Sequence, residues 1–107
     1  MNPTEEQLIA DLKAKYGKVI TVTIPLDEDD ETKVLKYHLK KPDKTVRKMV
    51  SKMAEKSSEN AVIAAYNALR VGGDEVAALQ SNDDALLSAE YALVEILAVQ
   101  KASIKKN

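Results

Sequence analysis

The sequence predicts an α+β fold in which an N-terminal helix is followed by an antiparallel β-hairpin and then by a three-helix C-terminal half. Two segments, 18–24 and 33–40, alternate their residues in the way of half-buried strands. Before and after them, apolar residues recur at the spacing of amphipathic helices. A chain of 107 residues is one domain, which we expect to span residues 1–107. Clusters of turn-forming residues separate the segments, at 40–44, 71–75 and 82–84.

The first helix is predicted to begin after Thr4 and to end at Gly17. Thr4 and Gln7 are placed to form a capping box, in which each side chain bonds the other residue's backbone amide. Gly17 can supply a left-handed C-cap. The helix should lie against the rest of the domain through its apolar residues, Leu8, Ile9, Leu12 and Tyr16.

The two strands are predicted to pair as an antiparallel hairpin. Pro25 follows the first strand directly and either ends its pairing or confines it to a sheet edge. The single histidine, His38, falls on the outward face of the second strand between two lysines, where we expect a surface role. The acidic segment 27–31 should form a solvated loop. The residues expected to face inward are Ile20, Val22, Ile24, Leu35, Tyr37 and Leu39.

The second helix is predicted to begin after the N-cap Asp43, with an apolar stripe on one face and basic residues on the other. The two methionines of the stripe either fill gaps in the core or present a partner surface. The stripe consists of Val46, Met49, Val50 and Met53, and the outward basic residues are Lys44, Arg47, Lys48 and Lys52.

A third helix is expected after Ser57, with Gly72-Gly73 as its stop, whereas residues 75–79 are too few to assign. The last helix should begin near residues 81–84 and run for roughly 20 residues. The alanines of these two helices could pack within the monomer or against another copy, so a homo-oligomer is possible. The last helix contains Leu86, Leu87, Leu93, Val94, Leu97 and Ile104 and ends in Lys101, Lys105 and Lys106.

Composition limits the compartment and the chemistry. The chain has no cysteine, which excludes disulfides, thiolate metal sites and cysteine nucleophiles. No apolar run approaches the ~20 residues of a membrane helix, and the acidic N-terminus is unlike a signal peptide. We therefore expect a cytoplasmic protein without a membrane partner.

Nowhere in the sequence do a nucleophile, a base and oxyanion donors gather, so we expect no enzyme, no cofactor and no metal site. The acidic loop lacks the ligand spacing and central glycine of a calcium loop. Residues 33–56 carry nine Lys and Arg against two acids, a net charge of +7, whereas the remainder carries −8. This asymmetry is either ordinary surface charge or a means of steering an acidic partner. Because no stacking aromatics accompany the basic residues as a nucleic-acid platform would require, we expect no nucleic-acid binding.

The order of the turn motifs resembles that of small tail assembly chaperones encoded by tailed phages and prophages, particularly of Bacteroides-type hosts. The resemblance covers nearly the whole chain, and the last helix with its Lys-Lys ending belongs to it. The matching stretches are LKAKYGKV at 12–19, YHLKKPDK at 37–44, VGGDE at 71–75, DDALLS at 83–88 and the segment 93–106.

The resemblance implies a non-enzymatic protein that holds the phage tape-measure protein, or tail-tube protein, before the tail polymerises in the bacterial host cytoplasm. A structural virion component, such as a head–tail connector or tail-completion protein, is the alternative. A tape measure is a long amphipathic helix, which an apolar groove between helices can cover. We therefore expect partner binding by the second helix, through Val46, Met49, Val50 and Met53 and through Lys44, Arg47 and Lys48.

Overall fold

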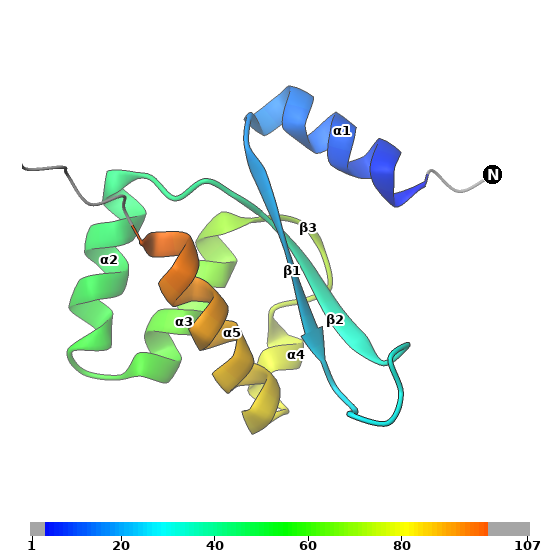
Figure 1. Ribbon diagram of the computed structural model, residues 1–107. Helices are drawn as coiled ribbons and strands as arrows, with labels where there is room; N and C mark the ends of the chain where they lie inside the picture. The colour runs from blue at the N-terminus through cyan, green and yellow to red at the C-terminus, as the bar shows by residue number, and fades with distance from the viewer. Residues whose placement is uncertain (1–3, 99–107) are drawn as a thin grey trace, which may run out of the picture.

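A computed structural model describes residues 4–98 and has the α+β fold that the sequence predicts (Figure 1). The N-terminal helix, the hairpin and the helical C-terminal half occur in the expected order. Between two of the expected C-terminal helices the chain adds a short strand and a short helix. The elements are α1 (Glu5–Tyr16), β1 (Val19–Pro25), β2 (Val34–Lys40), α2 (Lys44–Ala54), α3 (Ser58–Leu69), β3 (Arg70–Gly73), α4 (Ala77–Gln80) and α5 (Asp83–Leu97).

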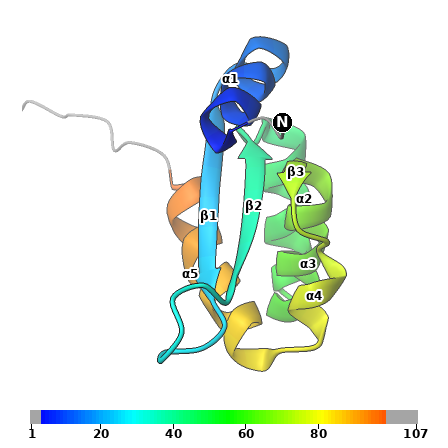
Figure 2. The same cartoon turned by 90° about the vertical axis from the view of Figure 1, so that its right-hand side faces the viewer.

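The three strands form one antiparallel sheet in the order β1-β2-β3, so the predicted hairpin is confirmed (Figure 2). Pro25 is the last residue of β1, which is an edge strand, as the position of a proline requires. The register places the residues expected to face inward opposite one another: Ile20 pairs with Leu39, Val22 with Tyr37 and Ile24 with Leu35.

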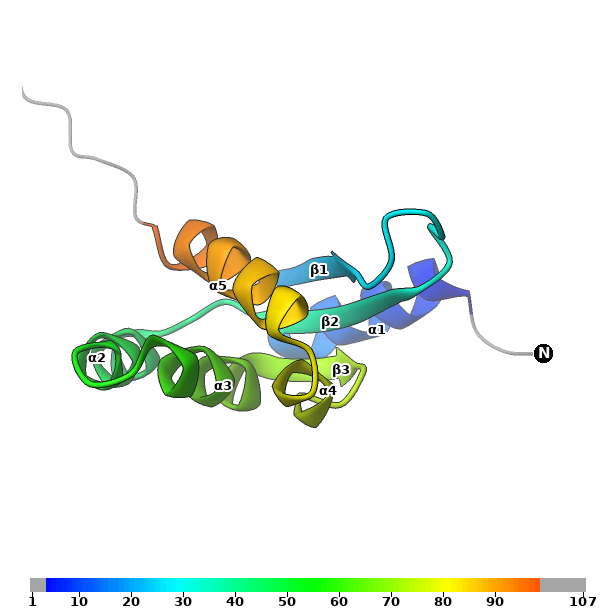
Figure 3. The same cartoon turned by 90° about the horizontal axis from the view of Figure 1, so that it is seen from below.

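The two faces of the sheet are covered differently. Helices α2 to α5 lie on one side of the strands, and α1 lies apart from them on the other (Figures 1 and 3). The core is therefore between the sheet and the C-terminal helices, where the rings of Tyr37 and Tyr66 meet edge to face at 5.4 Å between centroids. The Thr4–Gln7 capping box of α1 is present, but α1 has no fully buried residue. Its Glu5 forms an ion pair with Lys36 of β2 at 2.9 Å.

Sequence reasoning missed β3 and wrongly read Gly72-Gly73 as a helix stop. Helix α3 ends at Leu69, and both glycines lie in the strand that follows. β3 supplies hydrogen-bonding partners to the side of β2 that faces away from β1. Gly73 has a φ of +93°, and a Cβ there would lie 2.2 Å from the carbonyl oxygen of Lys36. Glycine therefore allows β3 to approach the backbone of β2.

The expected surface role of His38 is also wrong, because its side chain is only 3% exposed. Its Nδ1 lies 2.9 Å from the hydroxyl oxygen of Thr21, its register partner in β1. Gly72 of β3 lies beside the imidazole, and Leu12 of α1 lies over that glycine. The third strand and α1 therefore cover the part of this face around His38, whereas Thr21 and Thr23 stay exposed.

Helix α5 spans 15 residues, fewer than expected. The predicted lysine-rich helix end, with Ile104, lies outside the described residues. Within residues 4–98, no helix is both long enough and apolar enough to cross a membrane.

Candidate protein-binding surface

The apolar stripe predicted to bind a partner lies against the core of the monomer. Val50 is buried, and Val46, Met49 and Met53 are partly buried and pack against the core residues. Asp43 caps the helix as expected, because its carboxylate accepts a hydrogen bond from the Val46 amide. This placement suits the gap-filling role of the two methionines. Partner binding by the stripe stays a prediction, and a partner could reach only the exposed parts of Val46, Met49 and Met53.

The basic residues of α2 remain largely accessible. Lys44 and Lys48 are exposed and line an open depression of about 380 Å³ on the outer side of the helix. Arg47 is half-buried, and its guanidinium donates a hydrogen bond to the carbonyl oxygen of Leu97 in the last turn of α5. A cation at the C-terminal end of a helix is favourable because the helix dipole is negative there. Arg47 therefore joins α2 to α5, whereas the two lysines can meet a partner.

Among the large apolar side chains in the described part of the chain, those with the highest exposed fractions lie on the outer face of α5. Leu87, Tyr91 and Val94 are 46%, 67% and 65% exposed. Their spacing places them on one side of the helix, opposite the buried Ala89 and Leu93. We call these three residues the α5 apolar face. Because exposed apolar side chains that lie together often mark a site of protein–protein contact, this face is a candidate interface.

A small apolar cleft opens beside the α5 apolar face. Its volume is about 110 Å³, and it lies between α2, α3 and α5. An apolar cavity of roughly 150 Å³ can hold one benzene, so this cleft can accept one apolar side chain. Val94 belongs both to the cleft and to the α5 apolar face, which makes the two continuous. The apolar residues around the cleft are Val50, Ala54, Ala61, Val62, Leu93, Val94 and Leu97.

Sequence reasoning treated the apolar residues of α5 as one set and so missed this surface. The signal that could have found it is the distribution of these residues around the helix axis. On a helical projection, the α5 apolar face lies opposite the small residues Ala85 and Ala89. Because Ala85 and Ala89 face the core, Leu87, Tyr91 and Val94 remain on the solvent side of the helix.

Between residues 4 and 98, no three His, Cys, Asp or Glu side chains come close enough together to hold a metal ion. The buried tyrosines have structural partners: Tyr37 donates its hydroxyl to the Glu75 carbonyl at 2.8 Å, and Tyr66 donates to the Ala89 carbonyl at 3.0 Å. Burial raises the pKa of both phenols, which keeps them protonated hydrogen-bond donors.

Comparison with protein-family models, with curated proteins and with solved structures finds no significant match to this chain. The exposed face of α5 and the sequence resemblance are therefore the two grounds for assigning a function.

Proposed function

We propose that this protein is a non-enzymatic tail assembly chaperone, which acts in the cytoplasm of a bacterial host and holds a phage tape-measure or tail-tube protein until the tail polymerises. The observation that carries the proposal is the exposure of Leu87, Tyr91 and Val94 on a helix that is apolar on both sides. The sequence resemblance supplies the kind of partner.

The α5 apolar face suits a helical partner. A tape measure exposes apolar stripes along its helices before assembly, and such a stripe can lie along a second helix at the usual interaxial distance of about 8–10 Å. The cleft beside Val94 can take one side chain from the partner, as binding hot spots do. Tyr91 is the aromatic residue of this face, and tyrosine is enriched in hot spots.

The basic side of α2 contributes to encounter. Lys44 and Lys48 are exposed on α2, and Arg47 of the same helix donates a hydrogen bond to α5. Exposed charges of this kind change association rates more than final affinity. Charge reversal at Lys44 and Lys48 should therefore slow the association. Reversal at Arg47 should also loosen the contact between α2 and α5, so the two lysines give the cleaner test.

Co-expression with the tape-measure protein of the same phage tests the proposal. The wild-type protein should keep that partner soluble and co-purify with it. The double variant Tyr91→Ser/Val94→Ser should lose both effects while its free energy of unfolding changes by only about 0.5 kcal/mol per site, as exposed positions do. Leu26→Ser is the control, because Leu26 is an exposed apolar residue outside α5 and its replacement should leave binding intact.

Three outcomes would contradict the proposal. The first is a double variant that keeps the partner soluble as well as the wild type does. The second is stoichiometric recovery of the protein from purified virions, which would favour the structural-component alternative, since a chaperone leaves when the tube forms. The third is a stable dimer of the protein alone that Tyr91→Ser/Val94→Ser dissociates, because the α5 apolar face would then bind a second copy.

A further inference from the structure

The backbone of β1 has unused hydrogen-bonding groups along its outer edge. Lys36 in β2 donates its amide to the Asp74 carboxylate and accepts from the Asp74 amide, both at 2.7 Å, so its backbone groups point away from β1. In an antiparallel pair, two opposed residues either bond each other or both face away. Thr23, the partner of Lys36, therefore points its amide and carbonyl outward. By the period of two, Val19 and Thr21 do the same.

This edge is open over a limited length. Within residues 4–98, no strand pairs with β1 on the side away from β2. Pro25 would also point its backbone outward, by the same alternation as Thr23, but proline has no backbone N–H. The open edge therefore ends before Pro25. Natural proteins usually block edges with proline, lysine or a bulge. Between Val19 and Thr23, β1 carries none of these.

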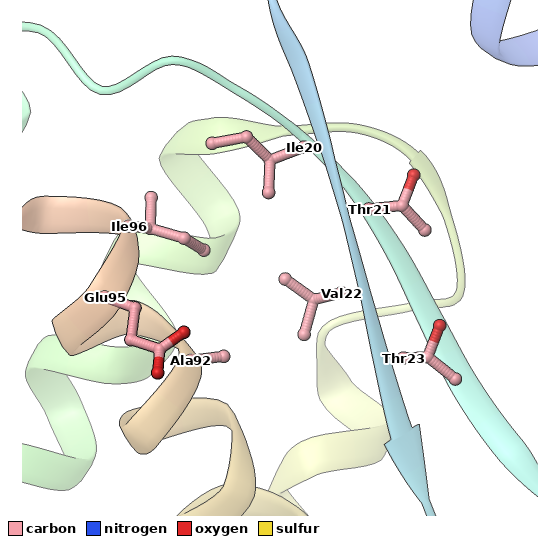
Figure 4. A pocket seen from close by; sticks show the side chains of 7 residues that line it. All are labelled: Ile20, Thr21, Val22, Thr23, Ala92, Glu95 and Ile96. Carbon is pink, nitrogen blue, oxygen red and sulfur yellow. The ribbon is translucent and has the colours of Figure 1, made fainter.

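A groove of about 420 Å³ runs below the open edge, between β1 and α5 (Figure 4). Ile20 and Val22 point from the strand toward α5, whereas the side chains of Thr21 and Thr23 point to the other side of the strand. Ala92 and Ile96 form the helical wall. A chain added beside β1 would thus place alternate side chains over an apolar surface.

Among the residues that the structure describes, the charged residue that lines this groove is an acid. The Glu95 carboxylate lies on its helical wall, and among residues 4–98 no Lys or Arg lines it. A second hollow of about 300 Å³ lies at the hairpin end of α5, and none of the described residues that line it is basic. The acidic residues lining that hollow are Asp27, Glu28 and Asp84.

We propose that the outer edge of β1 binds an extended, basic segment of a partner protein by strand addition. The backbone of the segment would bond Val19, Thr21 and Thr23, its alternate apolar side chains would cover the groove, and its Lys or Arg residues would face Glu95 and the acids near the hairpin. A second copy fits less well, because twofold pairing of β1 with itself would bring the acidic sides of two α5 helices together. This site is separate from the α5 apolar face.

The probe is a fluorescein-labelled eight-residue peptide of alternating valine and lysine, and fluorescence anisotropy measures its binding to the full chain. We expect saturable binding that the matching valine–glutamate peptide does not show. Glu95→Gln should weaken it about two- to fivefold, as loss of an exposed ion pair does. Glu59→Gln, which removes an exposed acid on α3, should leave it unchanged.

Two further measurements test the strand geometry. Thr23→Pro removes one outward amide without removing a bond to β2 and should weaken the peptide at least about tenfold. Amide hydrogen exchange should show protection of Val19, Thr21 and Thr23 when the lysine peptide is added, with little change at Ile20 and Val22, which already face β2. The exchange measurement needs no variant, so it decides the matter even where Thr23→Pro unfolds.

Equal binding of the acidic peptide, or full binding to a folded Thr23→Pro variant, would overturn the proposal. So would an unchanged exchange pattern at the three outward amides. A dimer of the protein alone that Thr23→Pro dissociates would assign the edge to a second copy and would also overturn it. Tyr91→Ser/Val94→Ser should retain peptide binding, so failure here and failure of the proposed chaperone function can be told apart.

Discussion

Replacing Gly73 with alanine should destabilise the protein far more than the same change at Gly17. Both glycines have positive φ, +93° and +82°, which an L-residue rarely adopts. Backbone strain of this kind costs about 1–3 kcal/mol at either site. The surroundings differ: a Cβ at Gly17 would meet nothing within 4 Å, whereas one at Gly73 would lie 2.2 Å from the Lys36 carbonyl oxygen.

The clash at Gly73 can be relieved only if β3 moves away from β2. That movement breaks the two 2.7 Å hydrogen bonds between Lys36 and Asp74, one of which involves a carboxylate. A neutral hydrogen bond contributes about 1 kcal/mol and a charged one about 1.5–3. Gly73→Ala should therefore cost roughly 2–4 kcal/mol more than Gly17→Ala. This difference is a large part of the roughly 5–15 kcal/mol that stabilises a typical domain.

Urea unfolding of both variants, followed by circular dichroism at one temperature, measures the difference. Gly17→Ala is the matched control, because it carries the backbone strain without the clash. Losses that agree within about 0.5 kcal/mol, the size of an ordinary surface effect, would refute the close approach of β3 to β2.

Leu39→Ala should lower the free energy of unfolding by about 2–5 kcal/mol, because Leu39 is fully buried; a loss below about 0.5 kcal/mol in urea titration would place it at the surface. The free energy of unfolding should fall as the pH rises above about 10, because burial gives Tyr66 a higher pKa in the folded chain than in the unfolded one. One tyrosine contributes at most about 1.4 kcal/mol per pH unit to this fall. Tyr66→Phe should reduce that slope in unfolding measured between pH 8 and pH 11 (~3 units, spanning the ordinary tyrosine pKa), and an unchanged slope would contradict its cause. Association with DNA or RNA should be weak and should vanish steeply with salt; micromolar or tighter binding at physiological salt, measured by anisotropy, would contradict the absence of a nucleic-acid site.

The elements that sequence reasoning found are those with a strong local signal. The capping box at Thr4, the alternation in both strands and the stripe of α2 each specify a local structure, and the structure confirms them. β3 has no comparable signal, since four residues with two glycines favour a turn. β3 pairs with the backbone amides and carbonyls on the second edge of β2, and this contact between distant segments leaves no local signal in the sequence. His38 was misplaced for the same reason, because β3 and α1 cover it.

The candidate surface was predicted only in part. Lys44 and Lys48 were expected to be exposed and are, since a basic helix face seldom enters a core. The outer face of α5 was not found, because the sequence makes both sides of that helix apolar. Which side the sheet covers depends on how α5 packs, and the side that meets the core carries Ala85, Ala89 and Leu93.

The hydrogen bond from the Tyr66 hydroxyl to the Ala89 carbonyl helps to set the rotation of α5 about its own axis. The inner side of that helix also carries Leu93, which is buried, so this hydrogen bond and hydrophobic packing favour the same orientation of α5. Advancing the helix by one residue would turn it by about 100° and carry Tyr91 toward the core. The buried hydroxyl of Tyr66 therefore helps to determine which side chains of α5 are exposed to solvent.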